Sequence, residues 1–140
     1  MTELPTIRAL ADLVDLVTER PVYLRYSDGP DTDDGPSLDY ESGVELPGLS
    51  VTTLAPEPWW TRPAEDWIAR RLCKYAELGS ERGRFAWILC GREVGRGPDH
   101  EPVVTDITPV AVIDEKVIDE AKRVYRSRFE VAQDSRCRQM

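Results

Sequence analysis

The chain has 140 residues, of which 41% are hydrophobic and 31% are charged, as in an ordinary soluble globular domain. Its 18 basic and 26 acidic residues give a net charge of −8, which argues against a dedicated nucleic-acid-binding protein. No apolar run approaches the roughly 18 residues that a membrane-spanning helix needs. Residues 1–6 lack the basic and apolar parts of a secretory signal. We therefore expect a cytoplasmic protein with no membrane segment.

Charge is distributed unevenly along the chain. Residues 1–66 carry a net charge of −10, whereas residues 67–140 carry +2. A small phosphate-bearing ligand is therefore compatible with the second half, although bulk nucleic acid is not expected. This dipolar pattern also favours head-to-tail association into a homo-oligomer.

The first half of the chain predicts one helix and two strands. Apolar residues recur at helical spacing between Thr6, the expected cap, and Pro21, which ends the helix. Strands are expected over residues 22–27 and 49–54, where residues of high β propensity gather. Between them, residues 28–48 hold seven acidic side chains among prolines and glycines, so we expect an irregular acidic segment.

The second half predicts two helices and two strands. A helix is expected to begin near Thr61 and Pro63 and to stop at Leu78-Gly79. The uninterrupted apolar run Phe85–Leu89 is typical of a central strand covered on both faces. Another strand is expected over residues 103–113, with an interruption near Pro109, and Asp114 should cap the last helix.

These elements together predict one domain of the α+β class. We expect a small, mostly antiparallel sheet with about three helices over residues 1–131, followed by a flexible C-terminal tail at 132–140.

Neither the cysteines nor the acidic residues predict a metal site. Cys73, Cys90 and Cys137 form no C-x-x-C pair, and His100 is the single histidine, so three reduced thiols and no zinc are expected. The acidic segment 28–48 lacks the spacing of a calcium-binding loop.

Two segments are candidates for ligand contact. Residues 91–102 place Gly95 and Gly97 on either side of Arg96, which suits either a phosphate cradle or a twisted hairpin with arginines paired to carboxylates. The adjacent Trp59 and Trp60 predict either an aromatic at the lip of a pocket or one indole in the core and one over a helix end.

From these residues we expect a module that binds a protein partner or a small anionic ligand without a cofactor. The glycine-rich charged segment and the tryptophan connector are the features that such binding would use. The candidate binding residues are Arg25, Trp60, Arg92, Arg96 and Glu101.

Five separated strings resemble a family of small uncharacterised proteins found in actinobacteria. The resemblance covers residues 4–130 and implies a single domain but no reaction. The strings are, in order, YLRYSDGP, DYESGVELPGLSV, EPWW, EDWIARRLCKYAEL and GREVGRGPDHEPVV.

A looser resemblance links the chain to ADP-ribosyltransferases of the arginine–serine–glutamate class. Arg25 on the first strand, Ser50 on the second and Glu101 in a later turn occur in that order. The resemblance implies an enzyme with a nicotinamide dinucleotide as substrate, in which the arginine pairs the pyrophosphate and the glutamate stabilises the cationic ribose.

This second resemblance departs from the family pattern at two places. Val51-Thr52 replaces the usual Thr-Ser, and Asp99 replaces the first Glu or Gln of the turn. The hypothesis requires Arg25, Ser50 and Glu101 to converge on one cleft.

Overall fold

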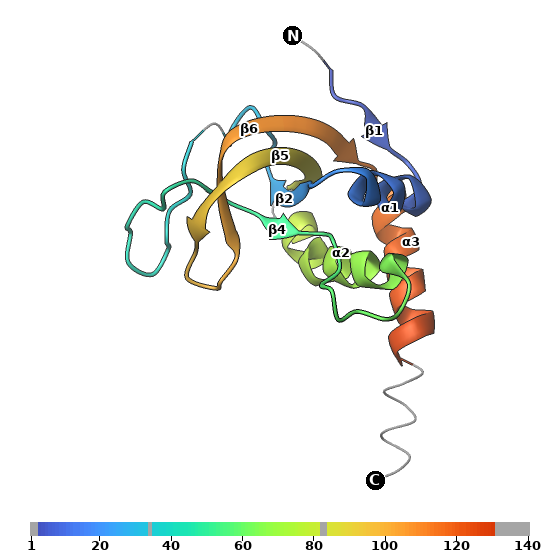
Figure 1. Cartoon of the computed structure of the whole chain (residues 1–140). Coiled ribbons are helices and arrows are strands. Elements are labelled where there is room, and N and C mark those ends of the chain that lie inside the picture. The colour runs from blue at the N-terminus through green and yellow to red at the C-terminus, as the bar shows by residue number, and fades with distance from the viewer. Residues whose placement is uncertain (1–2, 34, 82–83, 131–140) are drawn as a thin grey trace.

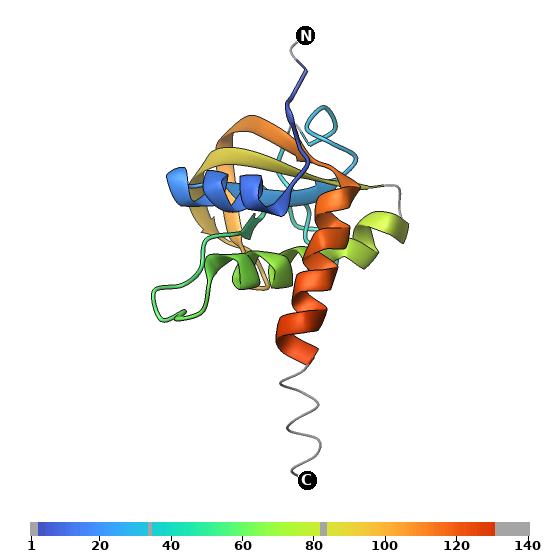
Figure 2. The same cartoon turned by 90° about the vertical axis from the view of Figure 1, so that its right-hand side faces the viewer.

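Three helices lie on one side of a curled sheet in the computed structural model, which describes residues 3–33, 35–81 and 84–130 (Figures 1 and 2). The architecture is that of a single α+β domain, as predicted. In chain order, the elements are β1 (Thr6–Ile7), α1 (Leu10–Glu19), β2 (Tyr23–Ser27), β3 (Leu49–Ser50), β4 (Thr52–Thr53), α2 (Ala64–Glu81), β5 (Phe85–Arg96), β6 (Pro102–Ile113), α3 (Glu115–Tyr125) and a π-helical turn (Arg126–Glu130).

The sheet is mixed, which corrects the prediction of a mostly antiparallel sheet. Its strand order is β1-β6-β5-β2-β4, and β3 pairs with β6 beside this path. The strand β1 runs parallel to β6, with Thr6 opposite Val112. Periodicity could not reveal β1, because it has only two residues and the helical apolar pattern continues directly after it.

The strand β5 lies at the centre of the sheet and has an apolar core on each face. Ala86 and Ile88 belong to the core that the three helices cover, whereas Trp87 and Leu89 belong to a second core within the curl of the sheet. Alternate side chains of a strand point to opposite faces, so an unbroken apolar run serves both cores. The prediction for residues 85–89 is therefore confirmed.

The segment 91–102 is mostly strand rather than a long loop. The strands β5 and β6 form one antiparallel hairpin that extends to the pair Arg96–Pro102, and β6 continues through Pro109. The register shifts beside Gly91 and Gly95 indicate bulges, where glycine is common. Of the two interpretations left open, the structure shows the twisted hairpin with paired arginines.

The helix boundaries differ from those predicted at two places. Thr6 lies in β1, so α1 begins at Leu10 with Ala9 as its N-cap and has no side-chain capping bond. The helix α2 continues to Glu81 instead of stopping at Leu78-Gly79. The predicted cap of α3 is confirmed, because the Asp114 side chain accepts a hydrogen bond from the Lys116 amide.

A buried carboxylate connects α2 to the end of the C-terminal helical segment. The Asp66 side chain is 2% exposed and forms ion pairs with Arg62 at 3.1 Å and with Arg128 at 2.8 Å. Arg62 also lies over the Phe129 ring, 4.5 Å from its centroid. The π-helical turn is therefore fixed to the start of α2 by charge as well as by packing.

Two of the three cysteines lie in the described part of the chain. Cys73 and Cys90 are partly buried free thiols, and burial raises the pKa of the Cys73 thiol. Cys137 and the predicted tail at 132–140 lie outside the described residues. Among residues 3–33, 35–81 and 84–130, no helix has the length and apolar composition needed to cross a bilayer.

Tyr26 is expected to make stability fall at alkaline pH. Its hydroxyl donates to the Leu72 carbonyl, and burial, with a smaller contribution from Cys73, raises the pKa of its phenol. The unfolded chain therefore loses this proton first, near pH 10, so the stabilisation is complete below that pH and declines above it.

Urea denaturation at several pH values between 8 and 11 tests this expectation. The free energy of unfolding should fall less steeply above pH 10 in Tyr26→Phe than in the unmodified chain. Tyr40→Phe is the matched control, because Tyr40 is 89% exposed. Identical alkaline slopes for all three proteins would contradict the assignment to Tyr26.

Candidate functional site

A cleft opens between β2, β3 and β4, the β5–β6 turn and the side of α2 that carries Arg71 and Lys74. We call it the Ser50–Glu101 cleft. Its volume of about 680 Å³ falls in the range of small-molecule sites. Its lining includes Leu24, Arg25, Tyr26, Ser50, Val51, Thr52, Thr53, Glu57, Arg71, Lys74, Arg84, Arg96, Asp99, His100, Glu101 and Pro102.

The centre of this cleft is a carboxylate held on both of its oxygens. The Ser50 hydroxyl donates to Glu101 Oε2 at 2.7 Å, and the Asp99 amide donates to Oε1 at 3.1 Å. Ser50 and Glu101 are both partly buried. The two hydrogen bonds fix the orientation of the carboxylate, and each oxygen retains a lone pair for a ligand.

Arg25 links Ser50 to the acidic segment. Its Nη1 donates to the Ser50 carbonyl at 2.9 Å, while Nε and Nη2 donate to Asp33 at 3.1 and 3.4 Å. Arg25, Ser50 and Glu101 therefore converge on one cleft, as the transferase hypothesis requires. The guanidinium positions Ser50, and three of its five N–H groups are already engaged by Asp33 and the Ser50 carbonyl.

The tight turn at residues 97–101 places Glu101 over Ser50. The Gly97 amide donates to the Glu101 carbonyl at 2.8 Å, and His100 has a φ of 61°, a left-handed conformation typical of such hairpin turns. A Cβ at Gly97 would overlap the Glu101 carboxylate. Glycine at this position is therefore what leaves room for the carboxylate.

The cleft is more positive than the chain as a whole. Five cationic side chains and three acidic ones line it, in a protein whose net charge is −8. Arg25 and Arg96 were among the predicted binding residues, whereas the other three, Arg71, Lys74 and Arg84, were not. Arg71 and Lys74 lie on α2, and helical periodicity alone does not show that this side of the helix faces a cleft.

Two of the predicted binding residues lie elsewhere. Arg92 is 71% exposed and pairs with Asp106 at 3.1 Å, away from the cleft. The Trp60 indole covers the start of α2, where its Nε1 donates to the Pro63 carbonyl. The exposed member of the tryptophan pair is Trp59, although Trp60 was the one predicted as a binding residue.

The described residues offer no metal centre. Residues 3–33, 35–81 and 84–130 contain no group of three or more His, Cys, Asp or Glu side chains arranged to hold a metal ion. The ligand chemistry of the cleft rests on arginines, hydroxyls and one oriented carboxylate.

Fold and site together define an α+β domain with a cationic cleft built around an oriented glutamate. The chain belongs to a family of unknown function, DUF6098, whose model matches residues 1–136. This agrees with the resemblance to a family of uncharacterised proteins. No curated protein matches the chain, and no solved structure matches it either.

Proposed function

We propose that the protein binds a nicotinamide dinucleotide in the Ser50–Glu101 cleft and breaks the bond between its ribose and nicotinamide. The observation that supports this most directly is the 2.7 Å contact between Ser50 and Glu101, with Arg25 bonded to the same serine. These are the three positions that resemble the arginine–serine–glutamate transferases. Convergence from three separate parts of the chain was the strictest requirement of that hypothesis.

The chemistry needs a negative charge beside the ribose. As the bond between ribose C1′ and the nicotinamide nitrogen breaks, its electron pair leaves with nicotinamide, and positive charge develops at C1′. A carboxylate fixed next to this carbon stabilises that charge, and Glu101 would supply it. Water or an acceptor nucleophile then bonds to C1′ and releases a proton to solvent.

The cations of the cleft suit the pyrophosphate of such a ligand. Arg71, Arg84 and Arg96 line the same cleft as Glu101, and Arg96 also pairs with Glu93 at 3.1 Å. Arginine donates to phosphate oxygens in bidentate geometry and keeps its charge at any physiological pH. A dinucleotide would therefore bind with its phosphates among these arginines and its nicotinamide ribose at Glu101.

The chain departs from the transferase pattern at Val51-Thr52 and at Asp99, and these residues lie in different surroundings. Val51 borders the cleft but packs in the core inside the curl and is 3% exposed, so its side chain offers the cleft only apolar surface. Thr52 and Asp99 line the cleft. Asp99 has a shorter side chain than the Glu or Gln of the pattern, which affects how an acceptor would be held rather than the charge at C1′.

A nicotinamide-release assay tests the proposal. The chain is incubated with dinucleotide labelled in the adenine ring, with and without cell extract, and free nicotinamide and labelled protein are measured. We expect nicotinamide release that depends on Glu101, with Glu101→Ala as the inactive reference. Release by neither sample, at dinucleotide concentrations that calorimetry shows to saturate the site, would overturn cleavage.

Binding without chemistry is the second candidate function. It is favoured by the bidentate contact of Asp33 with Arg25, which already occupies one edge of the guanidinium with a carboxylate. A small anionic ligand would then bind at the remaining arginines. Saturable binding of the dinucleotide with no nicotinamide release in either sample would favour this function.

Gly97→Ala is expected to lower nicotinamide release about tenfold with little change in stability. The new Cβ would push the Glu101 carboxylate away from the Ser50 hydroxyl, because both would occupy the same space. Steady-state kinetics and urea denaturation measure the two effects. Gly95→Ala is the matched control, because its Cβ would meet only Pro47 at 3.9 Å. Equal activity in both variants would show that the position of Glu101 does not matter.

A further inference from the structure

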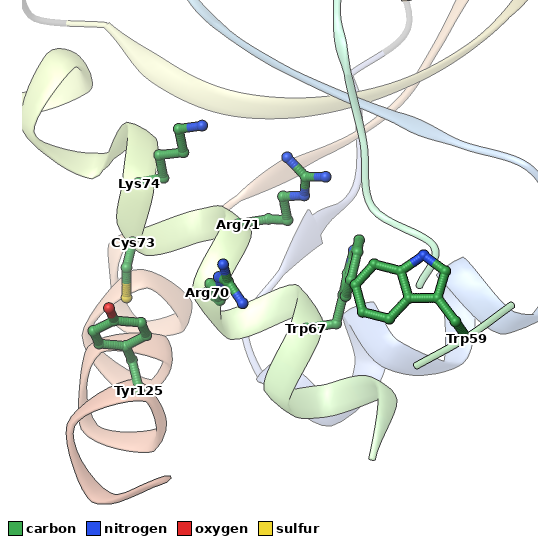
Figure 3. A pocket seen from close by; sticks show the side chains of 7 residues that line it. All are labelled: Trp59, Trp67, Arg70, Arg71, Cys73, Lys74 and Tyr125. Atoms are coloured by element: carbon green, nitrogen blue, oxygen red, sulfur yellow. The ribbon is translucent and has the colours of Figure 1, made fainter. Parts of the chain in front are cut away.

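A second hollow runs along the outer face of α2, and we call it the aromatic groove. Its volume is about 530 Å³. Figure 3 shows Trp59 and Trp67 at one end, Tyr125 with Cys73 at the other, and cationic side chains between them. The lining residues are Trp59, Trp67, Arg70, Arg71, Cys73, Lys74 and Tyr125.

Trp59 presents a large aromatic surface to solvent but is held in a fixed position. The side chain is 68% exposed. Its ring meets those of Trp60 and Trp67 edge to face, with centroids 6.2 and 5.7 Å apart. An exposed indole fixed by two others can stack on a ligand ring without losing much conformational freedom.

The groove and the Ser50–Glu101 cleft share a wall. Arg71 and Lys74 line both hollows. The Arg71 guanidinium lies 5.2 Å from the centroid of the Trp67 ring, so a cation stands where the aromatic surface meets the cleft. A ligand that spans both hollows would carry an aromatic ring at one end and negative charge at the other.

The Trp67 indole also carries a buried polar group. Its side chain is 7% exposed. Within the described part of the chain, its Nε1 is buried and has no hydrogen-bond partner. Buried donors are normally paired, so this indole N–H lacks an acceptor.

We propose that the aromatic groove binds the adenine base of a nucleotide whose phosphates lie in the Ser50–Glu101 cleft. Trp59 would supply the stacking face, and Arg71 would contact the phosphate nearest the adenosine. This inference rests on the proposed function, because it takes the cleft to be the phosphate site. It names the class of ligand as an adenine nucleotide and assigns Trp59 as a specificity residue.

Calorimetric titration of the full chain with adenosine diphosphate and with inorganic pyrophosphate tests the groove. Base–aromatic stacking predicts that Trp59→Ala weakens adenosine diphosphate by about 10- to 100-fold and leaves pyrophosphate unchanged. Trp59→Phe, which keeps an aromatic ring, should recover most of the affinity. Val94→Ala removes an exposed apolar side chain on β5, outside both hollows, and should change neither affinity.

The outcomes separate this inference from the proposed function. If the unmodified chain binds both probes and Trp59→Ala weakens them equally or not at all, the groove assignment is overturned while the phosphate cleft stands. If the unmodified chain binds neither probe nor the dinucleotide, both are overturned. With the dinucleotide as substrate, Trp59→Ala should raise KM and leave kcat within about threefold.

Discussion

Glu101→Gln is expected to lower kcat for nicotinamide release by about 100-fold or more, with KM changed by less than about threefold. The amide has nearly the same shape as the carboxylate and can still accept from Ser50, so binding should persist. It lacks the negative charge that offsets the charge developing at ribose C1′. Steady-state kinetics with the dinucleotide measure both constants.

Three further variants show whether the effect belongs to Glu101. Asp106→Asn removes a carboxylate from the same hairpin but outside the cleft, and it should leave kcat unchanged. Ser50→Ala should lower kcat about tenfold, because Ser50 is a positioning residue that holds Glu101 rather than a catalytic residue. Ser50→Thr, which restores the hydroxyl, should recover part of the loss. Normal kcat in Glu101→Gln would exclude a catalytic role for Glu101.

The double variant Arg62→Ala/Arg128→Ala is expected to lose about 3 kcal/mol of unfolding free energy. It leaves the Asp66 carboxylate, which is 2% exposed, without either of its two cationic partners. An uncompensated buried charge costs far more than an exposed ion pair contributes. Urea denaturation followed by circular dichroism measures the loss.

A matched control and a third substitution identify the source of that loss. Arg92→Ala breaks an ion pair in which both side chains are more than 70% exposed, and it should cost no more than about 0.5 kcal/mol. Adding Asp66→Ala to the double variant removes the buried charge, so part of the lost stability should return. A double variant as stable as Arg92→Ala would show that the Asp66 pairs contribute little.

Much of the secondary structure could be predicted from local patterns. The unbroken apolar run at residues 85–89 placed a central strand correctly, and Asp114 capped the last helix as expected. The extension of β5 from Gly91 to Arg96 could not be predicted in this way. Gly91 and Gly95 are poor strand formers, and the pairing of the surrounding residues with β6 outweighs this local preference.

The sequence by itself determined the residue types that the chemistry uses and the order in which they occur. It identified Arg25, Ser50 and Glu101 through a resemblance, but nothing in their spacing shows that they meet. Ser50 lies 51 residues before Glu101, and the two side chains come together only because β3 pairs with β6 and a tight turn reverses the chain.

The distribution of charge was likewise determined partly by the sequence and partly by the tertiary structure. Composition set a net charge of −8 and a slightly basic second half. Only the tertiary structure decided that Arg71, Arg84 and Arg96 face one cleft while Arg92 points away from it. Strand register and helix orientation depend on contacts between distant segments, and such contacts leave no periodic signal in the sequence.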